Sequence, residues 1–237
     1  MSAITRRSNA AEPPSREGEG GFFARTRLPT GHGTFDVRVH VDDEGKEHVA
    51  VSTGELKGAF GLPVRIHSEC LTGEVLGSLK CDCKQQLDAA LKFMQEAGRG
   101  LVLYLRQEGR GIGLGNKIRA YALQEQGYDT VDANHLLGLP DDARTYEAAA
   151  QMIRRLGISS VTLMTNNPAK IDALRLLGVD VAGRIPLVIA GTSEHAASYL
   201  ATKRARMGHL LSEDGRGGDE GDEGGAPVFE LAEEAGD

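Results

Sequence analysis

The chain has 237 residues, of which 40% are hydrophobic and 26% charged, and it contains three cysteines. This length and composition are typical of a globular protein with a sizeable core, and no apolar run approaches the roughly 18 to 20 residues of a membrane-spanning helix. The N-terminus lacks the apolar segment of a secretory signal, so we expect a cytoplasmic protein that does not bind membranes.

The net charge of −7 is distributed unevenly along the chain. Residues 213–237 carry ten acidic side chains and one basic side chain, whereas residues 1–212 carry a charge of +2. We expect a disordered N-terminal arm over residues 1–21, one folded domain over 22–211, and an acidic, glycine-rich, disordered tail over 212–237. The sequence has no basic block of the kind that nucleic-acid-binding proteins use, so we expect no nucleic-acid partner.

The first half of the chain predicts strands, and the second half alternates strands with helices. Polar and apolar residues alternate over 35–41 and 47–53, which indicates antiparallel strands, and 63–69 predicts a further strand. The expected later elements are helices at 85–98, 116–126, 144–157, 165–178 and near 194–207, and strands at 101–105, 160–164 and 179–189. The sequence therefore predicts a mixed α/β fold, with an antiparallel-rich N-terminal part and a three-layer α/β/α-like C-terminal part in a single compact domain.

All three cysteines lie within fourteen residues, as Cys70, Cys81 and Cys83. An odd number of thiols does not suit a set of disulfides, whereas zinc accepts thiolate ligands in a tetrahedron. Three protein ligands with an open fourth position are typical of a catalytic zinc, which lowers the pKa of bound water. The spacing leaves two other interpretations open: a structural site closed by a histidine such as His67, or buried thiols without a metal.

Two loops are candidates for phosphate binding. Residues 106–117, RQEGRGIGLGNK, follow a predicted strand and precede a helix, and Arg106, Arg110 and Lys117 could contact polyphosphate. The alternative is a flexible surface loop with scattered charge. Residues 165–170, TNNPAK, form a strand-to-helix turn of the kind that binds ligands in open α/β sheets, although helix capping explains the same residues.

The spacing of Asp142 and Arg144 does not by itself indicate chemistry. From spacing alone, a solvated turn with acidic residues is the preferred explanation of the pair. The arginine guanidinium is also a poor nucleophile because it stays protonated.

Several segments, taken together and in this order, are similar to the GTP cyclohydrolase II family over roughly residues 30–211. They are RIHSECLTGE, SLKCDC, RQEGRGIGL, NKIRAYALQEQGYDTVDANH, the Asp-x-Arg of DDARTY, TNNPAK and KRARMGHLL. The resemblance implies a homodimeric zinc enzyme that opens riboflavin biosynthesis. Such an enzyme converts GTP to formate, pyrophosphate and 2,5-diamino-6-ribosylamino-4(3H)-pyrimidinone 5′-phosphate.

The resemblance also assigns roles to individual residues. Cys70, Cys81 and Cys83 would bind one zinc ion with a water as fourth ligand, and Mg²⁺ would accompany the triphosphate. Asp142 would be the proton acceptor, Arg144 the nucleophile, and Tyr121 would act in the later hydrolysis. The residues that would line the GTP site are Arg65, Ile66, His67, Ser68, Glu69, Gln86, Glu108, Gly109, Arg110, Thr130, Thr165 and Lys170.

Two other functions remain open from the sequence. Gly115 and Leu136 depart from the usual family residues, which leaves room for a paralogue that stops at the formylated pyrimidine. Because three thiols can also hold a structural ion, a zinc-stabilised nucleotide-binding module without turnover is the other alternative.

Overall fold

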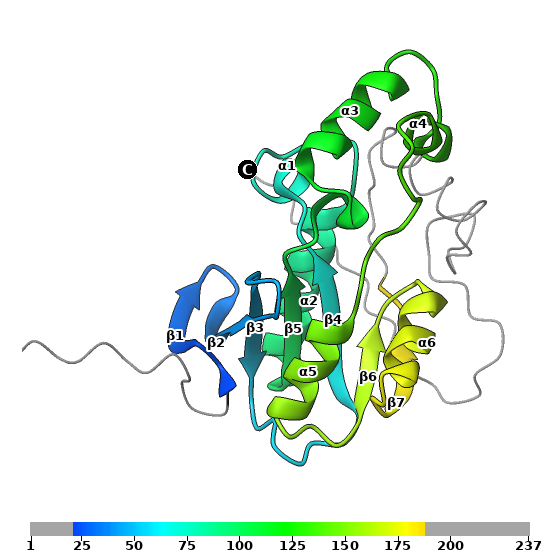
Figure 1. Cartoon of the computed structure of the whole chain (residues 1–237). Helices are drawn as coiled ribbons and strands as arrows, with labels where there is room; N and C mark the ends of the chain where they lie inside the picture. Colours follow the sequence, from blue (N-terminus) through cyan, green and yellow to red (C-terminus); the bar gives the residue numbers. More distant parts are fainter. Residues whose placement is uncertain (1–20, 188–237) are drawn as a thin grey trace, which may run out of the picture.

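The computed structural model describes residues 21–187 and shows a mixed α/β protein built on one seven-stranded sheet (Figure 1). The strand order is β1-β2-β3-β5-β4-β6-β7. Neighbours from β1 to β5 pair antiparallel, and neighbours from β5 to β7 pair parallel. The strands are β1 Ala24–Thr30, β2 Gly33–Val41, β3 Glu47–Thr53, β4 Leu62–Ser68, β5 Gly100–Leu105, β6 Val161–Met164 and β7 Val181–Ile185.

The burial of each strand follows its sequence pattern. Buried and partly exposed residues alternate along β3, as expected for an antiparallel strand with one covered face. Both central parallel strands, β4 and β5, are buried along most of their length because helices cover both faces. The edge strand β1 is exposed throughout and reads ARTRLPT, which has no apolar alternation, so the sequence did not predict it.

Helices cover both faces of the parallel half of the sheet (Figure 1). The helix α2, Cys83–Ala97, packs Phe93 and Met94 against one face. The helix α5, Glu147–Arg155, packs Met152 and Ile153 against the other face, beside α6, Pro168–Leu176. The expected three-layer arrangement is therefore confirmed.

Three further helices lie around the carboxyl ends of β4 and β5 (Figure 1). They are the short α1, Leu71–Glu74, and the pair α3, Leu114–Gln124, and α4, Thr130–Leu136, which pack against each other. The sequence did not predict α1 or α4, and Gly115, which we expected in a loop, lies in α3.

The segments expected to be disordered, and the helix expected near 194–207, lie outside the described residues. Within residues 21–187, no helix combines the length and apolar character needed to cross a lipid bilayer.

The parallel strands set the position of the candidate site. Because β4, β5 and β6 run in the same direction, the segments that follow them leave from the same edge of the sheet. The segment after β4 contains Cys70, the segment after β5 begins at Arg106, and the segment after β6 begins at Thr165. Residues 36 to 95 positions apart in sequence therefore lie at one edge.

Candidate functional site

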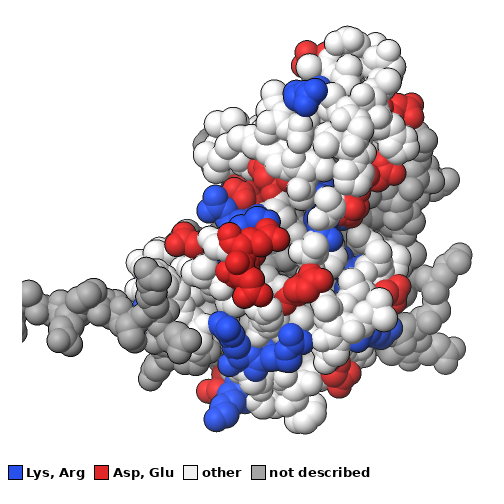
Figure 2. Space-filling model, in the orientation of Figure 1, with Lys and Arg blue, Asp and Glu red and all other residues white. Residues whose placement is uncertain are grey.

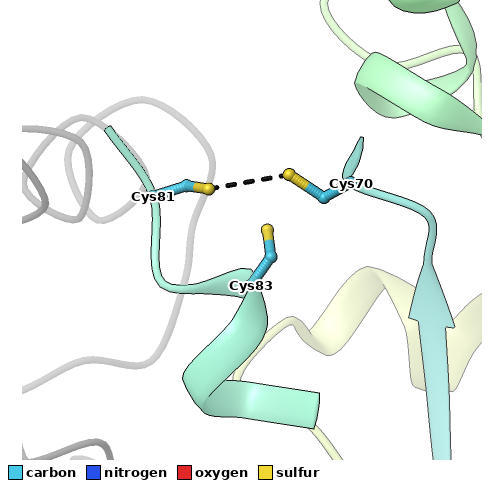
Figure 3. A group of neighbouring side chains, drawn as sticks. All are labelled: Cys70, Cys81 and Cys83. Atoms are coloured by element: carbon cyan, nitrogen blue, oxygen red, sulfur yellow. Dashed lines mark hydrogen bonds between the residues drawn. The ribbon is translucent and has the colours of Figure 1, made fainter. Parts of the chain in front are cut away.

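The three cysteines converge on one point, as the sequence predicted (Figure 3). Cys70 follows β4, Cys81 lies in the loop after α1, and Cys83 begins α2. Their Sγ atoms lie within 4.8 Å of one another, and the Sγ atoms of Cys70 and Cys81 are 3.6 Å apart. Cys70 and Cys81 are buried.

This donor set fits a tetrahedral zinc ion. Two sulfurs bound at about 2.3 Å in a tetrahedron are about 3.8 Å apart, which is close to the observed separation of Cys70 and Cys81. Gly73 keeps the space beside the sulfurs open. A β-carbon at Gly73 would lie 2.7 Å from the Sγ of Cys81 and 3.2 Å from that of Cys70.

A buried ammonium group supports a thiolate at this point. Lys117 of α3 places Nζ 3.1 Å from the Sγ of Cys70 and 2.8 Å from Oε1 of Glu108. Hydrogen bonds from Cys81 and Cys83, together with Lys117, lower the pKa of the Cys70 thiol. Burial opposes the charge on Lys117, but the hydrogen bonds to Glu108 and Cys70 outweigh it and raise the pKa of Lys117.

Tyr121 lies beside the thiols. Its hydroxyl hydrogen-bonds Thr72, whose own hydroxyl is 3.7 Å from the Sγ of Cys70. The Nζ atoms of Lys80 and Lys117 lie 4.8 and 5.8 Å from the centroid of the Tyr121 ring. Burial raises the pKa of Tyr121 to about 12, so its hydroxyl stays protonated at neutral pH.

Buried charged side chains lie under the same edge of the sheet. Arg65 of β4 donates to the carbonyl of Met164 at 2.9 Å and also to Oε1 of Gln86 in α2. Burial lowers the pKa of Arg65 to about 10, so it remains a cation. Lys170 of α6 donates to the carbonyl of Ile66 at 3.0 Å.

The loop after β5 is a tight turn that Glu108 organises. Glu108 is buried, and its carboxylate accepts from the backbone N–H groups of Leu71 at 2.6 Å and Gly109 at 2.9 Å. Gly109 and Arg110 both have φ near +60°, which is the left-handed region. Arg106 at the start of the loop donates to Glu69 at 2.9 Å, so the first residues after β4 and β5 are joined.

The segment containing Asp142 and Arg144 packs directly on this loop. The N–H of Ala143 donates to the carbonyl of Arg110 at 2.9 Å, and a β-carbon on Gly111 would lie 2.6 Å from the Ala143 oxygen. Arg144 donates through Nε to Asp142 at 2.8 Å. Burial opposes ionisation of Asp142, but the hydrogen bond and charge of Arg144 prevail and lower its pKa.

Comparison with known proteins agrees with this geometry. Residues 22–186 match the family model described as GTP cyclohydrolase II. A protein named GTP cyclohydrolase-2 from Acinetobacter baumannii (strain AYE) is 54% identical over 195 residues, which cover 81% of this chain and 97% of that protein. Another protein of that name, from Picrophilus torridus, is 50% identical over 190 residues, which cover 80% and 98% of the two chains.

The chain belongs to the GTP cyclohydrolase II family. A crystal structure titled RibBX, a two domain 3,4-dihydroxy-2-butanone 4-phosphate synthase from A. baumannii, is 18% identical. It matches with a TM-score of 0.34, over 61% of this chain and 33% of that chain, and this similarity is too low to support an argument.

Most of the residues expected from the GTP cyclohydrolase II resemblance lie around one edge of the sheet. The three thiols, Tyr121 and Glu108 are joined through Lys117 and Thr72, and Asp142 and Arg144 join the same loop at Arg110. Ser68 is joined to the loop after β5 by the bond of 2.9 Å that Gln107 donates to its hydroxyl, and Thr165 follows the parallel strand β6 at the same edge. Thr130 begins α4, which packs on α3 in the projecting part of the molecule (Figure 1).

Sequence reasoning did not select Gly73, Glu74 or Tyr104. Gly73 and Glu74 stand three and four residues after Cys70. This closeness in sequence to a proposed zinc ligand was the one feature that could have indicated a role for them. Tyr104 lies on β5 opposite His67 of β4, a pairing that requires the strand register.

Proposed function

We propose that this chain hydrolyses GTP, opens the imidazole ring of guanine, and releases formate and pyrophosphate with the pyrimidinone phosphate as product, as the first step of riboflavin biosynthesis. The observation that carries the proposal is the convergence of three thiols on one point beside Lys117 and Tyr121. Identity of 50 to 54% to proteins named GTP cyclohydrolase-2 gives independent support.

Cys70, Cys81 and Cys83 would hold one zinc ion. When bound, zinc lowers the pKa of a coordinated water towards about 7, which supplies a nucleophile for C8 of guanine at neutral pH. Lys117 supports the negative charge of the thiolates, and Glu108 keeps Lys117 in place. Gly73 leaves the volume beside the sulfurs unfilled.

The triphosphate would lie along the loop after β5. Gly109 and Arg110 give this loop a tight positive-φ turn, and cationic side chains with Mg²⁺ would neutralise the phosphate charge. Asp142 holds Arg144 next to this loop. In the proposed order of events, Arg144 takes up the α-phosphoryl group as pyrophosphate leaves, and Asp142 accepts the proton that the guanidinium loses.

The remaining candidate residues would bind and orient GTP from the edge of the sheet. Arg65, His67 and Lys170 are buried and hydrogen-bonded within the protein, which reduces the cost of ordering these three side chains on binding. The proposed substrate-binding set is Arg65, Ile66, His67, Ser68, Glu69, Gln86, Glu108, Gly109, Arg110, Thr130, Thr165 and Lys170.

The position of Tyr121 favours the complete reaction over release of the formylated intermediate. The Tyr121 hydroxyl hydrogen-bonds Thr72, and the Thr72 hydroxyl contacts the Cys70 sulfur. Tyr121 therefore lies next to the proposed hydrolytic centre. Within the described residues, Gly115 and Leu136, which motivated the formyl-retaining alternative, make no hydrogen bond with the thiols. A β-carbon on Gly115 would meet no atom of residues 21–187 within 4 Å, and Leu136 is exposed.

The deciding experiment incubates the purified chain with GTP, Zn²⁺ and Mg²⁺ and measures formate and pyrophosphate in the same sample. Equal yields of the two are expected. Pyrophosphate without formate would establish the formyl-retaining reaction instead. The control is Cys83→Ser, which removes one thiol; turnover no higher than this control in folded, zinc-loaded protein would leave only a nucleotide-binding module.

We also infer that the chain forms a homodimer and binds neither membranes nor nucleic acid. Large apolar side chains are exposed near the thiols and on the projecting helices, namely Val75, Leu76, Leu79, Ile118 and Leu136. Such side chains suit an interface with a second copy. On the face shown in Figure 2, acidic and basic side chains are interspersed, which does not favour a polyanionic nucleic acid.

A further inference from the structure

One buried carboxylate joins two aromatic rings at the edge of the sheet. One carboxylate oxygen of Glu74 lies 2.8 Å from Nε2 of His67, within hydrogen-bond distance, and the other accepts from the Tyr104 hydroxyl at 2.5 Å. The rings of His67 and Tyr104 stack at a centroid distance of 5.7 Å and an interplanar angle of 19°. The side chains of His67 and Glu74 are only 2% and 8% exposed.

We call these three residues, His67, Glu74 and Tyr104, the carboxylate clamp, and they come from three elements. His67 and Tyr104 are register partners on the parallel strands β4 and β5, and Glu74 ends α1. The N–H of Glu74 donates to the carbonyl of Cys70 at 2.9 Å. The carboxylate clamp therefore joins the end of the sheet to the turn that carries the first thiol.

The carboxylate determines which nitrogen of His67 carries the proton. An ionised carboxylate only accepts hydrogen bonds, so the His67 nitrogen that faces it, Nε2, must be the protonated one. Burial lowers the pKa of His67, as do the nearby charges of Arg65 and Lys170, and the ring is therefore neutral at pH 7. In a neutral ring with a proton on Nε2, Nδ1 is an acceptor.

His67 Nδ1 is buried and has no hydrogen-bond partner among the atoms of residues 21–187. Buried nitrogen and oxygen atoms are paired in the great majority of cases, and the exceptions concentrate at functional positions. Arg65 stands two residues earlier on the same face of β4, and its buried Nε likewise has no partner within the described part of the chain. One face of β4 therefore carries both an acceptor and a donor at the candidate GTP site.

We propose that Glu74 is a positioning residue that holds His67 in the Nε2–H tautomer, so that Nδ1 accepts a hydrogen bond from an N–H or O–H group of the bound nucleotide. This proposal rests on the proposed function, because it assumes that GTP occupies the site. Tyr104 completes the carboxylate clamp by fixing the second carboxylate oxygen.

The test is ¹⁵N NMR of the histidine ring nitrogens in the zinc-loaded protein, with His67→Gln used to assign the His67 signals. Without nucleotide, the wild type is expected to show a neutral His67 with its proton on Nε2. Addition of a non-hydrolysable GTP analogue is expected to shift the Nδ1 signal in the direction of a newly accepted hydrogen bond. A proton on Nδ1, or an Nδ1 signal that the analogue leaves unchanged, would overturn the proposal.

Two matched variants, Glu74→Gln and Glu96→Gln, test whether Glu74 positions His67 or only stabilises the fold. In Glu74→Gln the side chain offers one donor and one acceptor, so we expect the Nδ1–H tautomer to become populated and KM for GTP to rise by about tenfold, as for a lost buried hydrogen bond. Glu96→Gln makes the same change at an exposed position of α2 and should alter neither quantity. Tyr104→Phe keeps the carboxylate and should keep the wild-type tautomer. Glu74→Gln with an unchanged tautomer would refute the positioning role.

The two proposals fail in different ways. Because the tautomer is measured without substrate, the expected tautomer in a protein that does not turn over GTP would refute only the proposed function. Normal GTP turnover with the proton on Nδ1 would refute only the role of Glu74. Since the wild-type spectra alone decide the tautomer, the test stands even if Glu74→Gln fails to fold.

Discussion

Gly73 lies in α1 beside the three thiols, and a β-carbon there would stand 2.7 Å from the Sγ of Cys81. Real β-carbons do not approach a sulfur this closely, so a larger residue must displace one of the proposed zinc ligands. Gly73 has a helical conformation, and its small size rather than its backbone freedom is what the site uses.

We predict that Gly73→Ala lowers zinc affinity by about 10- to 100-fold, because displaced ligands no longer match the tetrahedron. Zinc bound per chain after dialysis against a weak chelator measures the loss. Gly115→Ala is the matched control, since its β-carbon meets no atom within 4 Å and it lies in a helix. Wild-type zinc retention by Gly73→Ala would show that the sulfurs tolerate the added carbon.

The Asp142–Arg144 pair gives a prediction of pH dependence. The pKa of Asp142 is lowered in the folded chain, so its contribution to stability is fully present above the unfolded pKa of about 3.9 and disappears as pH falls through the folded value. Asp142→Asn should therefore flatten the fall in urea midpoint below about pH 4 relative to wild type. The exposed Asp172→Asn serves as the control, and identical slopes for both variants would contradict the prediction.

Asp142→Asn should also lower kcat by at least about 100-fold if Asp142 acts as the proton acceptor. The amide cannot take up a proton at neutral pH, although it still accepts a hydrogen bond from Arg144. Steady-state kinetics with GTP, with zinc content and circular dichroism to confirm folding, measure the effect. A loss of less than fivefold would remove Asp142 from the proposed mechanism.

Part of the site could be predicted residue by residue, and part depended on the fold. The thiol cluster was predicted from its spacing, and the roles of Lys170 and the Asp142–Arg144 pair from the family resemblance; the structure places all of them around one edge. Gly73 and Glu74 were not predicted because α1 has four residues, too few for a periodic signal. Their importance follows from three-dimensional contacts with Cys81 and His67.

At the scale of elements, two loops that are distant in sequence pack on each other at Gly111. Its φ is +87°, and an added β-carbon would lie 2.6 Å from the carbonyl oxygen of Ala143. Gly113 has a similar φ of +85°, but among residues 21–187 no atom lies within 4 Å of an added β-carbon. Alanine at Gly113 would therefore test backbone strain alone, whereas alanine at Gly111 would test both backbone strain and the contact between the two loops.

We predict that Gly113→Ala costs about 1 kcal/mol of unfolding free energy from its positive φ alone. Gly111→Ala should cost more and also lower kcat, because the clash moves Asp142 and Arg144 away from the loop. Urea unfolding and GTP kinetics on both variants measure the difference. Equal kinetics in the two variants would mean that contact between the loops does not position the pair.

His48 ties the β2–β3 hairpin to the start of the loop after β5. Its Nε2 lies 2.9 Å from Oδ2 of Asp42, and its Nδ1 accepts from the N–H of Arg106 at 3.1 Å. We predict that His48→Ala costs about 1–3 kcal/mol of unfolding free energy, because it leaves the Arg106 N–H unpaired. In His48→Asn the amide oxygen can take the place of Nδ1, so this variant should recover part of the lost unfolding free energy, as measured by urea unfolding. If it recovers none, the loss in His48→Ala comes from side-chain packing and not from the hydrogen bond to Arg106.

The elements that the sequence predicted best are those with strong periodicity. In α2, Leu87, Leu91 and Met94 line one face, and all three pack in the core as expected. The strand β1 and the seven-residue α4 lack such a signal: β1 is exposed throughout, and its place in the sheet comes from pairing with β2. The periodicity of apolar residues predicts elements that bury one face, such as α2. The formation of an exposed edge element such as β1 depends on pairing with its neighbour, which periodicity does not reveal.

At the scale of the whole molecule, the exposed apolar side chains predict self-association. We expect light scattering after size exclusion to give a mass near twice the 25.3 kDa of the chain. Ile118→Glu should shift the protein towards monomer, because burying an unpaired carboxylate in an interface is unfavourable. Leu176→Glu, at a site 89% exposed on α6, is the control. A monomeric wild type at micromolar concentration would refute the inference.

The order of the strands has a consequence for synthesis on the ribosome. All three thiols precede residue 84, whereas Lys117 lies downstream and β6, a partner of β4, ends at Met164. At about 5–20 residues per second, roughly 4 to 16 s separate translation of Cys83 from that of Met164. During that interval the thiols of the nascent chain lack their final enclosure, so the proposed metal ion and oxidants would compete for them before the enzyme is complete.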